Sequence, residues 1–413
     1  MKDKTEVAVI GAGPSGAIVA ALLNQLGHKV TVLEQARFPR FSIGESLLPQ
    51  CMEFVAQAGM TEAVRNGGFQ YKDGAAFARD GRHGSFDFTE KFTAGPGTTF
   101  QVQRAKFDQI LADAAAAQGV EIRYGHRIES IDISTGGEST LQVSSDSGAA
   151  YILEAKFVLD ASGFGRVLPR LLNLETPSDF PVRRSVFTHI EDNILDEDYD
   201  RNKILIVIHP MQADVWYWLI PFNDGRCSVG VVAKQHFFDQ PPISDDDNLN
   251  ILKAAIAASP DLSSLLKNAR FDTPVQTING YSSNVTTLHG NGFALLGNAG
   301  EFLDPVFSSG VTIAMKSASL VAPLVSRQLK GQEVDWASGY AAPLKQGVDT
   351  FRAYVEAWYQ GSFQQIVFAE NQNPAVREMV CAILAGYAWD TDNPFVKEPV
   401  RRLKALVELC GSS

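Results

Sequence analysis

The fold is decided by residues 7–16, Val-Ala-Val-Ile-Gly-Ala-Gly-Pro-Ser-Gly, which join an apolar run to a complete G-x-G-x-x-G motif. The apolar run predicts a central parallel strand that is buried on both faces. Gly11, Gly13 and Gly16 permit the turn, the close approach of a diphosphate and tight packing of the next helix. A second strand at 30–33 ends at Glu34, where an acidic side chain accepts hydrogen bonds from a ribose. This order of elements predicts a dinucleotide-binding fold.

Composition narrows the class of protein. The chain has 413 residues, enough for two domains or for one large domain with an inserted sheet. Its 20% of charged residues is that of an ordinary globular protein. Its net charge of −11 and lack of a basic tract argue against a nucleic-acid partner. The four cysteines are scattered without a C-x-x-C pair, so no metal site is expected. With no apolar run of bilayer length and a strand from the first residues, we expect no membrane span, no signal peptide and a cytoplasmic location.

Two later segments favour FAD over NAD as the bound dinucleotide. Residues 157–163 form an apolar strand ending in Asp160 and a turn of small residues, and residues 293–300 form another ending in Gly297 and Asn298. Both resemble segments of the glutathione-reductase-like and hydroxybenzoate-hydroxylase-like flavoproteins. There the second turn places an acidic side chain against the ribityl chain. Asn298 takes that place here, and its amide oxygen can still accept a hydrogen bond from a hydroxyl.

The dinucleotide fold is interrupted along the chain. We predict an α/β protein with a discontinuous, Rossmann-type FAD-binding domain at 1–75, 100–175 and 285–330. A substrate-side domain with a mostly antiparallel sheet is expected at 76–99 and 176–284, and a helical region at 331–413. Alternating apolar residues at 204–208, 216–220 and 227–231 predict a meander in the inserted sheet. Near the C-terminus, helical spacing of apolar side chains predicts a core-packing helix, with Phe351, Tyr354, Val355, Trp358 and Tyr359 on one face.

One predicted strand is unusually aromatic, Trp216-Tyr217-Trp218-Leu219-Ile220-Pro221. Its alternation places Trp216, Trp218 and Ile220 on one face and the other side chains on the opposite face. A well-packed core strand is one interpretation. In a dinucleotide-binding chain, however, W-x-W-x-I-P resembles the signature of flavin-dependent halogenases.

A second segment carries the same resemblance, Phe302-Leu303-Asp304-Pro305-Val306-Phe307-Ser308-Ser309-Gly310. In flavin-dependent halogenases a segment of pattern F-x-x-P-x-x-S-x-G covers the isoalloxazine ring and holds halide near backbone amides. Phe302, Pro305, Ser308 and Gly310 match that pattern. The start of the following helix would face the flavin or an anion. The alternative is a generic flavin-contact loop, because related hydroxylases also have Pro and Gly here.

A lysine completes the resemblance. Lys72 stands in the context F-x-x-K-x-G-A, which is similar to the active-site lysine segment of the shorter flavin halogenases. There the ammonium binds hypohalous acid, or forms a haloamine, and directs it to the substrate. The adjacent Asp73 would favour the charged lysine. From the sequence alone, a solvated strand residue is the alternative. Glu45 and Ser46 lie in a segment that resembles a stretch along the flavin, and Arg104 resembles an arginine beside the diphosphate.

The resemblance spans residues 11 to about 394 and implies an activity. Reduced FAD, supplied by a flavin reductase or by NAD(P)H, would form a C4a-hydroperoxide with oxygen, and chloride or bromide would attack it. Hypohalous acid would then reach Lys72 and an electron-rich aromatic ring, either free or bound to a carrier or protein. Trp216 and Trp218 would keep the substrate from the hydroperoxide. Two alternatives stay open: an aromatic hydroxylase that shares these motifs, and a flavin-binding protein without oxygen chemistry.

Overall fold

The computed structural model describes residues 2–134 and 137–410. Its first sheet has the order β18-β19-β10-β1-β2-β7, and β8 and β9 extend it through β10. The neighbours from β19 to β7 are parallel, as the buried apolar run predicts. The strands are β1 (Lys2–Ile10), β2 (Val30–Glu34), β7 (Glu121–Tyr124), β8 (His126–Asp132), β9 (Ser139–Ser145), β10 (Ala150–Asp160), β18 (His289–Gly290) and β19 (Phe293–Leu295).

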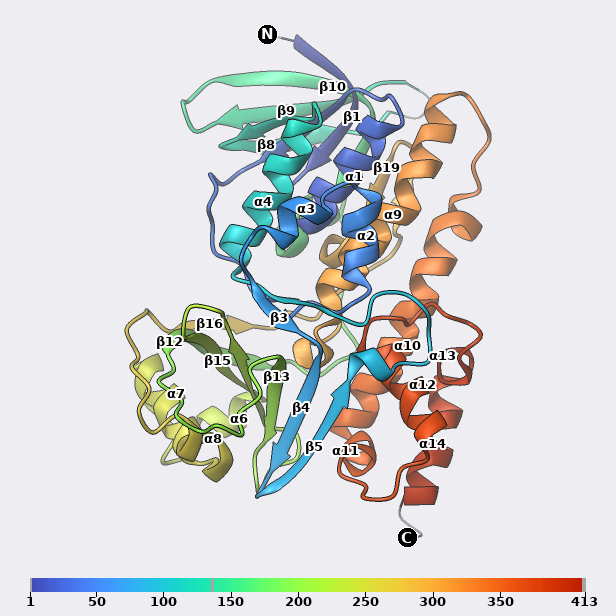
Figure 1. The fold of residues 1–413 in the computed structure, drawn as a ribbon. Helices are drawn as coiled ribbons and strands as arrows, with labels where there is room; N and C mark the ends of the chain where they lie inside the picture. Colours follow the sequence, from blue (N-terminus) through green and yellow to red (C-terminus); the bar gives the residue numbers. More distant parts are fainter. Residues whose placement is uncertain (1, 135–136, 411–413) are drawn as a thin grey trace.

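Helices cover this sheet in the upper half of Figure 1, where α1 (Pro14–Gln25) packs against α9 (Ser309–Leu329). α9 is long and apolar enough to cross a membrane. However, 67% of its most apolar 18-residue stretch is buried inside the protein, as in a core helix. Shorter elements connect the strands: α2 (Cys51–Gln57), α3 (Thr61–Arg65), β3 (Gln70–Lys72), η1 (Phe88–Glu90), β6 (Thr99–Gln101), α4 (Arg104–Ala117), η2 (Gly163–Gly165), α5 (Val167–Leu171), η3 (Gly297–Ala299) and η4 (Pro305–Phe307).

The second sheet has the order β16-β12-β15-β14-β13-β4-β5 and is antiparallel except where β13 pairs with β4. The predicted meander and the inserted, mostly antiparallel sheet are therefore confirmed. Its strands are β4 (Gly74–Arg79), β5 (Arg82–Asp87), β12 (Arg184–Glu191), β13 (Lys203–Ile208), β14 (Trp216–Pro221), β15 (Arg226–Ala233) and β16 (Gln276–Asn279). A separate small ladder joins β11 (Glu175–Thr176) to β17 (Asn284–Val285).

The two faces of β14 belong to different cores, as its alternation predicts. Tyr217 and Leu219 pack in a cluster beneath α6 (Gln235–Phe238), α7 (Asn248–Ala257) and α8 (Pro260–Leu265). Trp216, Trp218 and Ile220 belong to the large core that continues into the first sheet and the C-terminal helices. The tryptophan face of β14 is therefore turned toward the rest of the molecule.

The C-terminal region is helical, as predicted. It begins beside the first sheet, where Trp336 stacks on Phe157 of β10, and its later helices stand beside the second sheet in Figure 1. It contains η5 (Ala337–Ala341), α10 (Ala342–Tyr359), α11 (Ser362–Val367), α12 (Pro374–Leu384), α13 (Pro394–Lys397) and α14 (Pro399–Cys410). Phe351, Tyr354, Val355 and Trp358 are buried on α10, so the core-packing interpretation is confirmed for them. The domain boundaries given above stay a prediction.

Candidate active site

A cavity of about 350 Å³ lies between the carboxyl ends of the parallel strands and the tryptophan face of β14. Ligands bind in such a crevice in open α/β sheets. The cavity brings together candidate site residues from segments far apart in the chain: Gly11, Gly13, Glu34, Glu45, Ser46, Arg104, Trp216, Trp218, Asn298, Pro305, Ser308 and Gly310. Lys72, Gly16, Asp160 and Gly297 do not line it.

The three glycines of the G-x-G-x-x-G turn have different structural roles. Gly11 has φ +95, a conformation that suits glycine. A Cβ at Gly16 would lie 1.9 Å from the Gly11 carbonyl oxygen, so this position serves the packing of the turn. A Cβ at Gly13 would meet only Arg40 Nη2 at 3.4 Å and Asp108 Oδ2 at 3.9 Å. The open space at Gly13 is the cradle in which a diphosphate would sit.

Glu34 is almost completely buried at the end of β2. Its Oε2 accepts a hydrogen bond from the Ala12 N–H at 2.9 Å, and its Oε1 accepts one from the Ala36 N–H at 2.9 Å. The carboxylate thereby fixes the glycine turn to the end of β2. Each carboxylate oxygen can accept a second hydrogen bond, which leaves capacity for a ribose hydroxyl.

Two arginines share one buried carboxylate at this end of the cavity. Arg104 begins α4, as expected, and its Nε and Nη2 bind Asp108 at 2.7 and 3.0 Å, while its Nη1 donates to the Ile43 carbonyl. Arg40 Nη1 binds the same Asp108 at 3.1 Å. Since most Arg104 donors already have protein acceptors, Arg40 is the freer cation beside Gly13. Arg40 and Asp108 were not predicted as site residues, because no sequence motif marks them.

Asp160 and Gly297 support turns behind the cavity, so direct cofactor contact by these two residues is not supported. The Asp160 carboxylate accepts hydrogen bonds from the N–H groups of Ser162 and Leu168 at 2.9 and 2.6 Å. Gly297 has φ +52, and a Cβ there would lie 2.7 Å from the Ala314 side chain of α9. Asp160 therefore fixes the turn that follows β10, and Gly297 allows the turn after β19 to pack closely against α9.

Asn298 faces the cavity with an unused acceptor. Within the described residues, its Oδ1 is buried and has no hydrogen-bond partner. Such an atom is costly to bury without a donor, so the position is suited to a ligand that brings a hydroxyl. The basic open cradle at Gly13 and the acceptor at Asn298 together fit the diphosphate and ribityl chain of FAD.

The loop at 302–310 forms another wall of the cavity and leads into α9. Ser308 has φ +56, an uncommon conformation for a residue other than glycine, and it is the N-cap of α9. A Cβ at Gly310 would lie 3.1 Å from the Phe302 ring, so a side chain there would crowd it. The first turn of this 21-residue helix therefore presents its N–H groups toward the cavity, where an anion is favoured.

The two tryptophans of β14 are held in different ways. Trp218 donates its indole N–H to Ser228 Oγ at 3.0 Å within the same sheet, and a Cβ at Gly230 would lie 2.4 Å from its ring. Trp216 donates to the Tyr359 hydroxyl at 2.9 Å, on the C-terminal helix α10. The ring centroids of the two tryptophans are 6.0 Å apart. They form a continuous aromatic wall, of which only Trp216 is anchored outside the sheet.

Lys72 is fully buried behind the cavity wall, which rules out a solvated strand residue. Its Nζ donates to Ser46 Oγ and to the Leu47 carbonyl, both at 2.7 Å. Ser46 lines the cavity, so one side chain separates the ammonium from the cavity space. Burial lowers the pKa of Lys72 to about 7, despite opposing contributions from Cys51 and Asp73. The neutral amine is therefore accessible near neutral pH.

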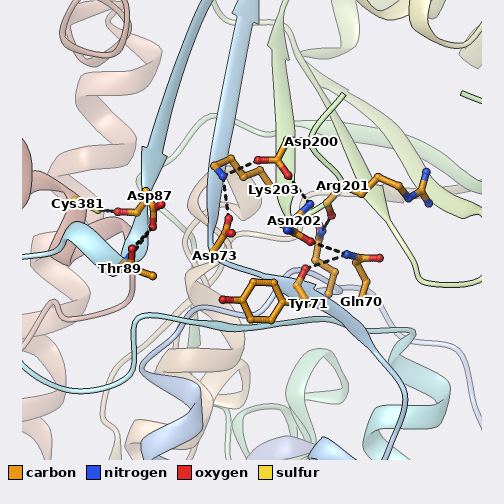
Figure 2. Close-up of polar contacts among 11 residues, drawn as sticks. Gln70, Tyr71, Asp73, Asp87, Thr89, Asp200, Arg201, Asn202, Lys203 and Cys381 are labelled. Atoms are coloured by element: carbon orange, nitrogen blue, oxygen red, sulfur yellow. Dashed lines mark hydrogen bonds and ion pairs between the residues drawn. The ribbon is translucent and has the colours of Figure 1, made fainter. Parts of the chain in front are cut away.

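Asp73 favours the charged lysine, as expected, but its carboxylate is bound elsewhere. Lys203 Nζ lies 2.9 Å from Asp73 Oδ1 and 2.6 Å from Asp200 Oδ2. Figure 2 shows Lys203 between these two carboxylates, with Asp73 pointing toward it. Asp73 therefore does not form an ion pair with Lys72, and burial decides the lysine pKa.

Glu45 forms a pair that the sequence analysis missed. His189 Nε2 lies 2.7 Å from Glu45 Oε1, and the pair joins the segment along the cavity to β12 of the second sheet. Burial lowers the pKa of His189, but the hydrogen bond and charge of Glu45 outweigh it, so the net shift is upward. Arg226 opposes this shift and Asp224 supports it. The imidazolium–carboxylate pair therefore persists above the usual pKa of histidine.

The described cysteines Cys51, Cys227 and Cys381 are free and buried. The side chain of Cys410 lies outside the described residues. Across residues 2–134 and 137–410, no group of three His, Cys, Asp or Glu side chains is placed to hold a metal ion.

We expect Asn298→Asp to keep or tighten FAD binding. A carboxylate would accept the ribityl hydroxyl in a charge-assisted hydrogen bond, which is generally stronger than a neutral one. We expect a gain of up to about tenfold in affinity, equivalent to about 1.4 kcal/mol. Flavin fluorescence titration would measure the dissociation constant, with Asn298→Leu as the control that removes the acceptor. A marked loss of affinity in Asn298→Asp would mean that the turn does not face the ribityl chain.

FAD binding should weaken as pH rises through the raised pKa of His189. The pair with Glu45 is complete below the usual pKa of about 6.5 and is lost when His189 deprotonates above it. The change should be about tenfold at most, and it should be absent in His189→Gln. Because Lys72 also titrates near neutral pH, the difference between wild type and variant is the informative quantity. Equal pH profiles for the two proteins would rule out this coupling.

Comparison with known proteins agrees with this geometry. The profile of the FAD binding domain family matches residues 4–336. The chain is 30% identical to flavin-dependent halogenase armH3 of Armillaria mellea, over 79% of this chain and 68% of that protein. It is 33% identical to tryptophan 2-halogenase of Chondromyces crocatus over 82% of this chain, but it spans only 64% of that protein's length.

Two full-length matches extend the comparison. A 1H-pyrrole-2-carbonyl-[peptidyl-carrier protein] chlorinase of Pseudomonas fluorescens is 26% identical over 98% of this chain and 94% of that protein. The crystal structure of a flavoprotein/dehydrogenase from Cytophaga hutchinsonii is 42% identical, with a TM-score of 0.94 and 99% of each chain covered. The predicted FAD-binding fold with its inserted sheet is confirmed.

Proposed function

The chain belongs to the flavin-dependent halogenases, a family of FAD-binding enzymes, and on this premise we propose that it halogenates an electron-rich aromatic substrate. The observation that carries the proposal is Lys72, fully buried one side chain behind the cavity with its pKa near 7. A structural lysine would be expected in an ion pair or with its amine in solvent. Lys72 instead bonds to a hydroxyl and a carbonyl.

The residues around the cavity divide into two groups by function. The cradle at Gly13, Arg40 and Glu34 would bind the nucleotide end of FAD, and Asn298 the ribityl chain. When bound and reduced, FAD would supply the electrons that activate oxygen for the oxidation of halide. Chloride or bromide would be held at the N-terminus of α9 beside Ser308, where backbone N–H groups and the helix dipole favour an anion.

Lys72 would carry the halogen to the substrate. Its neutral amine attacks the halogen of hypohalous acid, so an N–X bond forms, the X–O bond breaks and water leaves with the amine proton. The aromatic ring then takes the halogen and releases one proton, which restores the amine. Ser46 and the Leu47 carbonyl orient Nζ through the two hydrogen bonds described above. The pKa near 7 keeps a substantial fraction of the amine neutral at physiological pH.

The wall of Trp216 and Trp218 would separate the oxidation of halide at the flavin from the halogenation of the aromatic substrate. Both rings line the cavity and stand on the sheet face that meets the C-terminal helices. A substrate on the far side could be reached by a small oxidant but could not reach the flavin itself. The loop at Pro305 and Gly310 would cover the flavin at close range.

The proposed activity also requires a source of reduced FAD, a substrate and a compartment. We propose that a separate flavin reductase, or NAD(P)H, supplies reduced FAD. The nearly complete match to a pyrrolyl-carrier chlorinase supports a substrate that is free or bound to a carrier protein. The free, buried thiols of Cys51, Cys227 and Cys381 fit a reducing, cytoplasmic compartment.

Mass spectrometry of products from a panel of aromatic compounds would test the function. The reactions contain reductase, FAD and either bromide or chloride, and a parallel set contains no halide. Halide-dependent incorporation of halogen is expected. Oxygenated product formed without halide would instead assign an aromatic hydroxylase. Reoxidation of flavin without product from any carrier-bound or free substrate would favour a flavin-binding protein without oxygen chemistry.

A further inference from the structure

A partly buried chain of hydrogen bonds joins the aromatic wall to the loop at 302–310 through helix α10. The indole N–H of Trp216 donates to the Tyr359 hydroxyl at 2.9 Å, and that hydroxyl donates to Asp304 Oδ2 at 2.9 Å. Trp216 is on β14, Tyr359 is the last residue of α10, and Asp304 lies between the cavity-lining residues Phe302 and Pro305. One hydroxyl therefore connects three separate parts of the protein.

Asp304, the last acceptor of these hydrogen bonds, is fixed by several contacts. Its side chain is almost completely buried, and its Oδ1 accepts a hydrogen bond from the Val306 N–H at 3.1 Å. Arg183 Nη1 lies 3.9 Å from Oδ2, and the Arg183 guanidinium lies over the Tyr359 ring, 3.3 Å from its centroid. Burial raises the pKa of Asp304 to about 6, although Arg183 and the two hydrogen bonds oppose the shift. The carboxylate is therefore the charged form at neutral pH.

The two tryptophans of the wall depend on different supports. Trp218 is fixed within its own sheet by Ser228 and by the close packing of its ring on Gly230. Trp216 would lose its hydrogen-bond acceptor without Tyr359, and a buried indole N–H without an acceptor is unfavourable. The position of Trp216 is therefore set from outside the sheet, by the helical region and the loop that covers the flavin.

We propose that Tyr359 and Asp304 are positioning residues that hold the Trp216 ring in place as the barrier between flavin and substrate. By holding this barrier, they determine what fraction of the oxidant halogenates the substrate and what fraction is lost to water. The consequence for catalysis rests on the proposed halogenase function, but the orientation of Trp216 does not. The Tyr359 hydroxyl is thus the group through which α10 contacts Trp216 by a hydrogen bond.

The test compares Tyr359→Phe with Tyr354→Phe. Tyr354 is fully buried on the same helix, and its hydroxyl has no hydrogen-bond partner among the described residues, so the control removes the same atom from the same helix. The chain has five tryptophans, so five indole ¹H–¹⁵N resonances can be followed in the full-length, FAD-loaded protein. The Trp216 resonance is assigned by its loss in Trp216→Phe.

Tyr359→Phe should shift the Trp216 indole resonance, and Tyr354→Phe should leave it unchanged. Asp304→Ala, which removes the acceptor for the tyrosine hydroxyl, should shift it as well. In turnover, Tyr359→Phe should release severalfold more hydrogen peroxide per halogenated product than wild type and Tyr354→Phe. An unchanged Trp216 resonance in Tyr359→Phe, or an equal shift in the Tyr354→Phe control, would overturn the proposal.

The two readouts separate this inference from the proposed function. If wild type forms no halogenated product, the halogenase function fails, while the indole resonance still decides whether Tyr359 positions Trp216. Suppose that wild type halogenates and that Tyr359→Phe shifts the resonance without changing the ratio of peroxide to product. The hydrogen bonds of Tyr359 then do not control the use of the oxidant, and the halogenase function stands.

Discussion

Lys72→Ala should abolish halogenated product while FAD binding and the reoxidation of reduced flavin stay near the wild-type level. Lys72 lies behind the cavity wall, so its side chain is not needed to hold the cofactor. Without the amine, the oxidant has no group to capture it and is lost to water. We expect a loss of at least about a hundredfold in the rate of product formation, typical for removal of a group that acts directly in the chemistry. Product is measured by mass spectrometry and flavin reoxidation by stopped-flow absorbance.

Two further lysine variants sharpen this result. Lys72→Arg should also fail, because a guanidinium stays protonated and cannot readily form a haloamine. Lys203→Ala is the matched control, because its ammonium is bound to Asp200 and to Asp73, the residue next to Lys72 in the sequence (Figure 2). That variant should keep halogenating. Halide-free hydroxylation by wild type at an undiminished rate, with Lys72→Ala raising mainly KM, would count against the halogenase function.

Features that depend on short stretches of chain were predictable from the sequence. The strand–turn–helix at 7–25, the acid at Glu34 and the two-faced strand at 216–221 follow from local patterns, because backbone periodicity alone decides which side chains share a face. The core role of most α10 aromatics was predictable for the same reason. The motif residues also met at one cavity, since strand ends of a parallel sheet share an edge.

Contacts between distant segments were not predictable. Glu45 and His189 are 144 residues apart, and Trp216 and Tyr359 are 143 residues apart, so no spacing rule links them. Tyr359 has the same helical spacing as its core-packing neighbours, and only the packed structure shows that its hydroxyl reaches Trp216 and Asp304. Likewise, a strand lysine can be solvated or buried. The burial that brings the Lys72 pKa near 7 comes from the assembled fold.

Gly13→Val should abolish FAD retention without unfolding the protein. Gly13 has φ −70, a value open to any residue, and a Cβ there meets only Arg40 Nη2 at 3.4 Å and Asp108 Oδ2 at 3.9 Å. A valine therefore fits the FAD-free fold, at a cost of about 1 kcal/mol for a poor helix N-cap. Its branched side chain would, however, fill the cradle of the diphosphate. We expect at least about a hundredfold loss of affinity, measured by fluorescence titration of FAD.

The neighbouring glycine is the control that separates binding from folding. At Gly16 a Cβ would lie 1.9 Å from the Gly11 carbonyl oxygen, so Gly16→Ala must distort the turn itself. It should lower the thermal midpoint of the FAD-free protein by an overpacking cost near the upper end of about 1–3 kcal/mol, whereas Gly13→Val should lower it less. Purified Gly13→Val that still co-elutes with stoichiometric FAD would show that the cofactor does not approach this turn. Equal destabilisation of both FAD-free variants would mean that Gly13 is a packing position rather than a binding one.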